Sequence, residues 1–95
     1  MKSIYLIAYD LHTPGKSYNE LYDAIKAYSD WQHPLESMWF ICTEESDLQT
    51  IYSNLRKLID DNDNIYIQRV TSDIQEQGWL PKSFWEWLAN KRENA

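Results

Sequence analysis

Residues 3–10 have the sequence SIYLIAYD, an almost unbroken run of apolar and aromatic side chains that ends on a carboxylate. Isoleucine and tyrosine favour strands, and turn-forming residues follow the run at positions 12–15. A strand that is apolar at consecutive positions is buried on both faces, so the run predicts the central strand of a sheet. Asp10 would then emerge at the carboxyl end of that strand, where the side chains that bind ligands in α/β sheets gather.

Two segments have the 3.6-residue periodicity of amphipathic helices. In the first, Ser17 and Glu20 have the spacing of a capping box, which predicts a helix that starts there and ends near residues 29–30. In the second, Ser46 and Gln49 repeat that spacing ahead of the apolar positions of residues 48–59. Both helices should pack an apolar face on the sheet.

The residues between the two helices predict a pair of strands. We expect a short strand at 31–33, a tight reversal at Pro34–Leu35 and a longer strand at 36–43, because proline cannot donate to a sheet and favours an edge or a bend. Large apolar residues occupy both faces of the longer strand, which places it in the middle of the sheet. A last strand is expected at 65–70.

The C-terminal region begins with Gly78-Trp79-Leu80-Pro81 and continues into a helix at 82–91. Its apolar side should dock on the sheet or on a partner subunit. The order strand, helix, two strands, helix, strand is that of the ferredoxin-like βαββαβ fold. We therefore predict an α+β protein with an extra C-terminal helix and a single domain over residues 1–95, in which 1–73 form the core and 74–95 the tail and helix.

Composition narrows the class of protein. The 95-residue chain has five tryptophans and seven tyrosines, which is more aromatic surface than a small core hides easily. We therefore expect part of this surface at a subunit interface. Cys42 has no cysteine partner, and no segment is long and apolar enough to act as a membrane span or a signal peptide. We expect a soluble, cytoplasmic protein.

Charge argues against a stable nucleic-acid binder. The net charge is −6, and residues 31–63 contain two basic and seven acidic residues. Nonspecific affinity for nucleic acids comes from lysine and arginine side chains that neutralise phosphates. A metal-dependent nuclease that contacts its substrate briefly is less affected by this acidity.

Three sequence blocks resemble a known family. Tyr5-Leu6-Ile7-Ala8-Tyr9-Asp10 resembles the first-strand signature of the CRISPR-associated protein two family, which also includes the virulence-associated protein D ribonuclease toxins. Leu35-Glu36-Ser37-Met38-Trp39-Phe40 resembles the second block of that family. A SinR-like subgroup is closer still, on the basis of Tyr9-Asp10-Leu11, Pro14-Gly15-Lys16, Trp31 with Trp39, and Gly78-Trp79-Leu80-Pro81.

The resemblance implies a homodimer of ferredoxin-like subunits. In the family, the first-strand aspartates of the two subunits meet, hold one Mg²⁺ and support phosphodiester cleavage. Asp10 matches that metal-binding and catalytic position, and Ser37 matches the serine of the second block. The substrate implied is RNA or DNA.

Two further residues have suitable chemistry near Asp10 in sequence. His12 can act as an acid or a base near neutral pH, and Lys16 can contact a substrate phosphate. Each candidate also has a structural interpretation: Asp10 caps the following turn, His12 and Lys16 are solvated loop residues, and Ser37 is a small packing residue. The two glycines of the chain exclude a P-loop or a dinucleotide-binding motif.

Three functions therefore remain open. The first is an Mg²⁺-dependent endoribonuclease of the CRISPR-adaptation or toxin type that works as a dimer through Asp10. The second is a non-catalytic dimeric scaffold that binds a protein partner, which the acidic middle third favours. The third is a toxin–antitoxin or mobile-element module with regulatory DNA contacts, which the absence of a basic stripe disfavours.

Overall fold

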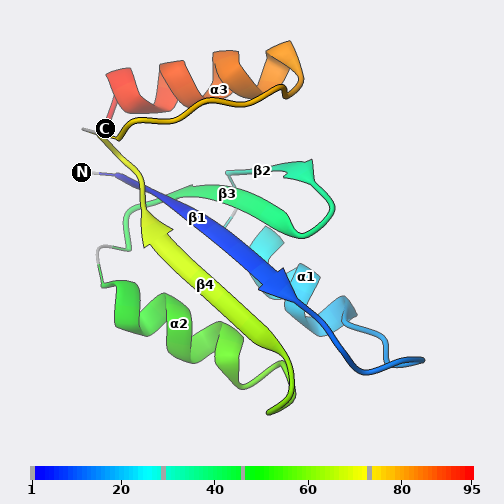
Figure 1. The fold of residues 1–95 in the computed structure, drawn as a ribbon. Helices are drawn as coiled ribbons and strands as arrows, with labels where there is room; N and C mark the ends of the chain where they lie inside the picture. Colours follow the sequence, from blue (N-terminus) through cyan, green and yellow to red (C-terminus); the bar gives the residue numbers. More distant parts are fainter. Residues whose placement is uncertain (1, 29, 46, 73) are drawn as a thin grey trace.

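The computed structural model describes residues 2–28, 30–45, 47–72 and 74–95. In chain order the elements are β1 (Ser3–Asp10), α1 (Asn19–Lys26), β2 (Trp31–Leu35), β3 (Met38–Thr43), α2 (Leu48–Arg56), β4 (Asn64–Arg69) and α3 (Lys82–Glu93). The chain has the predicted ferredoxin-like α+β fold with an additional C-terminal helix (Figure 1). Within the described residues, none of the helices is both long and apolar enough to cross a bilayer.

The strands of the described residues form one antiparallel sheet in the order β2-β3-β1-β4. β1 is therefore an inner strand, as its sequence predicts. Its register places Ala8 opposite Met38 on β3 and Asp10 opposite Asn64 on β4. The carboxyl end of β1 thus lies beside the start of β4 and close to the β2–β3 turn.

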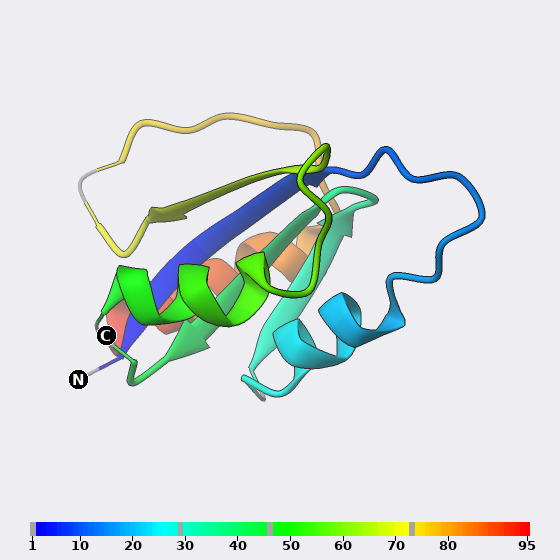
Figure 2. The same ribbon diagram turned by 90° about the horizontal axis from the view of Figure 1, so that it is seen from below.

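Separate helical layers cover the two faces of the sheet. Helices α1 and α2 lie on one face and α3 lies on the other (Figure 2). Tyr5 and Ile7 are fully buried in the core under α1 and α2, whereas Ile4 is fully buried in the core under α3. Successive strand residues point to opposite faces, so burial of both faces explains the continuous apolar run of β1.

Helix α3 docks on the sheet of its own chain. Phe84 and Leu88 form its buried face, with exposures of 2% each. Trp87 Nε1 donates to Oδ1 of Asp30 at 2.8 Å, and Nζ of Lys91 lies 2.8 Å from Oδ2 of the same residue. Of the two predicted docking partners for this helix, the structure thus shows the sheet.

The predicted capping box of the first helix is wrong. α1 begins at Asn19, and the residue at its N-cap position, Tyr18, makes no side-chain cap. The hydroxyl of Ser17 accepts the N–H of Asn19 at 3.4 Å, whereas Glu20 does not return a bond. The reason is a tertiary contact: Tyr18 is buried and bonded to Asp63, which sets the path of the chain into the helix.

The second predicted capping box falls partly on Ser46, which lies outside the described residues. Asp47 occupies the N-cap position of α2, and its carboxylate accepts the N–H of Gln49 at 3.0 Å. The helix therefore has an ordinary acidic N-cap one residue after the predicted position.

The predicted position of the β2–β3 reversal is also wrong. β2 continues through Pro34 to Leu35, and the turn is at Glu36–Ser37. β2 is an edge strand whose pairing with β3 is irregular between Gln32 and Leu35, and proline is tolerated at edge strands and bulges because it needs no ladder partner there. Ser37 consequently lies in the turn and not on the strand.

Candidate functional site

Asp10 is the last residue of β1, and its side chain is 81% exposed. It belongs to the sheet face that carries α3, because Ile4 and Leu6 precede it on the same face. In the described part of the chain, its carboxylate accepts no hydrogen bond, and its charged neighbour is His12. Asp10 therefore does not cap its own turn, and its carboxylate is available to a ligand.

His12 lies beside Asp10. Its Nε2 is 4.0 Å from Oδ2 of Asp10, and its side chain is 45% exposed. This separation is too long for a hydrogen bond, but it allows an ion pair when the imidazole is protonated. The structure thus brings together the two candidates that the sequence places two positions apart.

A buried carboxylate from the turn before β4 holds the loop that contains His12. Asp63 is 7% exposed and accepts the backbone N–H of His12 at 2.7 Å, the hydroxyl of Tyr18 at 3.0 Å and the N–H of Asp60 at 2.8 Å. Burial alone would raise the pKa of Asp63, but these donors outweigh it and hold the pKa below its ordinary value. Asp63 thereby fixes the backbone that carries His12.

Lys16 lies in the same loop as His12 and is paired with Asp60 of the turn before β4. Its Nζ lies 2.8 Å from Oδ1 of Asp60, and the hydroxyl of Thr13 donates to Oδ2 at 2.7 Å. The hydrogen bond to Asp60 raises the pKa of Lys16 above its ordinary value. One donor of this ammonium group is therefore already taken by a carboxylate.

Ser37 lies next to the end of β1. Its carbonyl accepts the N–H of Tyr9 at 3.0 Å, and its side chain is exposed. Ser37, Asp10 and Tyr66 are in the lining of a shared hollow of about 380 Å³. The structure therefore places Asp10, His12 and Ser37 at one end of the sheet, although His12 does not line this hollow.

A second hollow, of about 480 Å³, also has Asp10 and Ser37 in its lining. Four further residues with aromatic, imidazole or carboxylate side chains contribute to it: Tyr9, Tyr22, His33 and Glu36. The rings of Tyr9 and Tyr22 lie 6.2 Å apart between centroids. This hollow joins the candidate carboxylate to an aromatic surface.

His33 is the neighbour that sequence reasoning missed. Its ring stacks on the indole of Trp39, with centroids 3.7 Å apart and an interplanar angle of 12°. Nε2 of His33 lies 3.0 Å from the carbonyl oxygen of Glu36. The predicted hairpin could have indicated this contact, because a tight reversal between two strands brings their side chains into cross-strand pairs.

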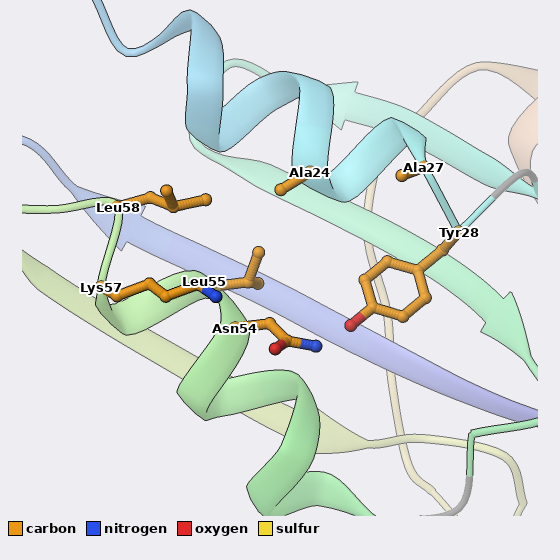
Figure 3. Close-up of a pocket in the computed structure, with 7 residues that line it drawn as sticks. All are labelled: Ala24, Ala27, Tyr28, Asn54, Leu55, Lys57 and Leu58. Carbon is orange, nitrogen blue, oxygen red and sulfur yellow. The ribbon is translucent and has the colours of Figure 1, made fainter.

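A third hollow lies between α1 and α2, away from these residues (Figure 3). It has a volume of about 340 Å³, and Ala24, Tyr28, Asn54 and Lys57 are in its lining. None of the candidate residues predicted from sequence lines it. It therefore offers no chemistry comparable with that of the Asp10 end of the sheet.

The donor set can be tested against the expected Mg²⁺. Among the described residues, no cluster of three or more His, Cys, Asp or Glu side chains could hold a metal ion. Mg²⁺ in nucleotide-processing sites uses one or two carboxylates and takes its other ligands from water and phosphates. Asp10 of one chain meets the lower end of that requirement, and two chains that share the site would supply two carboxylates.

Comparison with known proteins defines the family. The sequence model of the family described as CRISPR associated protein Cas2 matches residues 2–77. The chain belongs to the Cas2 family. The match includes all four strands of the described sheet and ends ahead of α3. It confirms the family resemblance of residues 5–10 and 35–40.

A solved structure has a similar fold. The crystal structure of a hypothetical protein, TT1823 from Thermus thermophilus, superposes with a TM-score of 0.61 at 24% identity, over 85% of this chain and 96% of that chain. At this identity the likeness extends to the fold alone. No curated protein matches the chain. The assignment to the Cas2 family thus rests on the family match.

Proposed function

We propose that this Cas2 family member is a cytoplasmic, metal-dependent endoribonuclease that acts as a homodimer, with Asp10 of each subunit at a shared centre. The observation that carries the proposal is the exposed carboxylate of Asp10 at the end of an inner strand, without a hydrogen bond among the described residues. A structural aspartate at such a position would be bound to its own turn. Membership of the Cas2 family supports a nuclease over other metal-dependent activities.

Exposed apolar side chains on the Asp10 face favour a homodimer. Tyr66, which lines the same hollow as Asp10, is 58% exposed. Leu35 is 46% and Trp79 100% exposed, and both line an apolar hollow on the face of the sheet that carries α3. A two-fold interface joins the same patch of both subunits, so burial of this patch would bring the two Asp10 side chains toward one another.

The residues of this end of the sheet have distinct roles in the proposed reaction. Asp10 would hold the Mg²⁺, which when bound polarises a phosphoryl oxygen and lowers the pKa of a coordinated water. His12 exchanges a proton with the reacting groups, since imidazoles do so near neutral pH. Ser37 can donate its hydroxyl to a phosphate oxygen in the hollow that it shares with Asp10. We assign Lys16 no role in this centre, because its ammonium group is paired with Asp60.

The test is cleavage of RNA and of DNA, with and without Mg²⁺, by the wild type and by Asp10→Asn. This substitution keeps the size of the side chain and removes its charge, so we expect Mg²⁺-dependent RNA cleavage by the wild type and none by the variant. His12→Ala should be slower by roughly 100-fold.

The matched control is Asp61→Asn, which replaces a carboxylate that is 98% exposed in the turn before β4. It should cleave like the wild type. Activity that survives Asp10→Asn, or no activity from a well-folded dimer, would refute the proposed nuclease, and cleavage of DNA alone would refute the assignment to RNA.

A non-catalytic dimeric scaffold for a protein partner is the second candidate. The excess of acidic residues between positions 31 and 63 favours it, and Glu44 and Asp47 are exposed between β3 and α2. A partner with a basic surface should then be recovered in stoichiometric amounts and be lost with Glu44→Lys, which leaves the N-cap of α2 in place. Glu93→Lys, at the end of α3, is the matched control. Rapid turnover by the purified protein without a partner would exclude this function.

Within the family, we propose that the chain is nearest the SinR-like subgroup. One of its motifs, Pro14-Gly15-Lys16, has a clear structural basis. The N–H of Lys16 donates to the carbonyl of Thr13 at 3.3 Å, and Gly15 has φ +75°. Proline followed by glycine at the centre of such a turn is typical of type II geometry, in which the second position requires a positive φ.

A further inference from the structure

The hollow that contains His33 is not explained by the proposed metal centre. Its volume of about 480 Å³ is within the range of sites that bind small molecules. Asp10 and Ser37 are in its lining, so a ligand in this hollow would lie against the proposed centre. Most of the remaining lining is aromatic, which a Mg²⁺ ion does not require.

His33 provides a flat, fixed surface in this hollow. One face of its ring lies on Trp39 at 3.7 Å between centroids, and Nε2 contacts the carbonyl oxygen of Glu36 at 3.0 Å. Trp39 is itself 2% exposed, so the platform under the imidazole belongs to the core. The His33 side chain is exposed and lines the hollow, and Trp39 covers one face of its ring.

The wall beside His33 is equally fixed. Trp39 Nε1 donates to the hydroxyl oxygen of Tyr9 at 2.9 Å, and that hydroxyl donates to the carbonyl of Glu36 at 3.2 Å. Burial raises the pKa of Tyr9, so its phenol stays neutral at physiological pH. Tyr22 packs against the same indole, with centroids 6.2 Å apart. A ligand that binds here therefore orders few side chains, which lowers the entropic cost of binding.

We propose that this hollow is a stacking site for an unpaired nucleobase of a single-stranded nucleic acid, with His33 as the platform. The choice of a nucleic-acid ligand rests on the proposed function, whereas the stacking surface does not depend on cleavage. Aromatic and imidazole rings bind the bases of single strands through their π faces, and a base paired in a duplex is not available for such stacking.

The charge of the hollow does not favour phosphate binding, so affinity for a nucleic acid would have to come from stacking. The hollow has two carboxylates, Asp10 and Glu36, and no lysine or arginine in its lining. Phosphate contacts alone would therefore give little affinity at this end of the sheet. Stacking on His33 supplies binding energy that needs no basic side chain and places the neighbouring phosphate near Asp10.

The test uses a short single strand that carries the fluorescent adenine analogue 2-aminopurine, whose emission is quenched when the base stacks. It is titrated as single-stranded RNA and as single-stranded DNA into the Asp10→Asn protein, in which no cleavage is expected, and an unlabelled duplex is then added as a competitor. We expect quenching with the single strands that an unlabelled single strand reverses and the duplex does not, and the RNA and DNA arms decide which single strand the site prefers. In this background, His33→Ala should weaken binding by about tenfold.

His33→Phe keeps a flat ring on Trp39 and should bind and quench like the parent protein, which separates stacking from any effect of His33→Ala on the fold. The matched control is Tyr52→Ala, which removes an aromatic side chain that is 39% exposed on α2. Unchanged binding by His33→Ala, or competition by the duplex as strong as that by an unlabelled single strand, would overturn the stacking site. If quenching depends on His33 but the wild type never cleaves RNA, the stacking site is supported and the proposed nuclease is refuted. If the wild type cleaves RNA but quenching does not depend on His33, the nuclease is supported and the stacking site is refuted.

Discussion

The backbone N–H of His12 donates a 2.7 Å hydrogen bond to Oδ1 of Asp63, 51 residues away in the chain. This contact joins the loop after β1 to the turn before β4. The position of His12 beside Asp10 thus depends on a buried carboxylate that takes no part in the proposed chemistry. The two loops should respond together when Asp63 is changed.

We expect Asp63→Asn to lower the midpoint of thermal unfolding by about 5 °C, measured by circular dichroism. An amide has one acceptor oxygen where the carboxylate has two, and its NH₂ group would face the N–H of His12 or of Asp60. Asp61→Asn, in the same turn, is the control and should leave the midpoint unchanged, because its ion pair with Arg56 is at the surface and such pairs contribute little to stability. Equal midpoints for the two variants would contradict the role of Asp63.

Acid should destabilise the protein through Asp30, which anchors α3. Burial alone would raise the pKa of this carboxyl group, but Lys91 and Trp87 outweigh it and hold the pKa below the ordinary value of 3.8. The folded chain therefore binds fewer protons than the unfolded chain between the two pKa values. The stabilisation is present above pH 3.8 and is lost as the pH falls through the folded-state value.

The measurement is urea unfolding at about pH 5 and about pH 3, where the free energy of unfolding of the wild type should fall on acidification. Asp30→Asn should be less stable than the wild type at the higher pH and should lose less on acidification. Asp60 and Asp63 also have lowered pKa values, so the variant keeps part of the acid sensitivity. The same pH dependence in both proteins would show that Asp30 contributes nothing.

The elements with clear periodicity could be predicted from sequence. The burial of β1 on both faces and the apolar faces of α1 and α2 follow from local rules, and so does the βαββαβ order. The position of the β2–β3 turn could not be derived, because Pro34 is compatible with either a bend or an edge strand and only the pairing with β3 decides between them.

Only part of the candidate site could be predicted from sequence. Asp10 and Ser37 follow from the strand pattern and the family resemblance. The contacts of Asp63 with the first loop, and the ion pair of Lys16 with Asp60, join residues more than forty positions apart. No local pattern encodes such contacts, so the sequence could not show that Lys16 is already engaged or that Asp63 holds His12.

Cys42 should be unreactive in the folded protein. It is 3% exposed, and burial raises the pKa of its thiol, which disfavours the reactive thiolate. A chromogenic disulfide reagent should therefore react slowly without denaturant and rapidly in urea. The reaction reports on one site, since the chain has a single cysteine. Fast, stoichiometric reaction of the native protein would contradict this burial.

Among the large hydrophobic side chains of the described residues, Trp79 exposes the largest fraction of its surface, which a second subunit could bury. It is fully exposed, so Trp79→Ser removes little intramolecular packing and should leave the unfolding midpoint unchanged. If the Asp10 face forms the dimer, the substitution should weaken association by about 2 kcal/mol or more, because a buried tryptophan is a typical interface hot spot. Sedimentation velocity over a range of concentrations would show this as a shift from dimer to monomer.

The control is Tyr52→Ala, which removes an exposed aromatic side chain on α2 and should leave the association unchanged. A wild type that is monomeric at every concentration would refute the homodimer. A dimer that neither Trp79→Ser nor Leu35→Ser weakens would have its interface elsewhere, and the proposal that the two Asp10 carboxylates share one centre would lose its support.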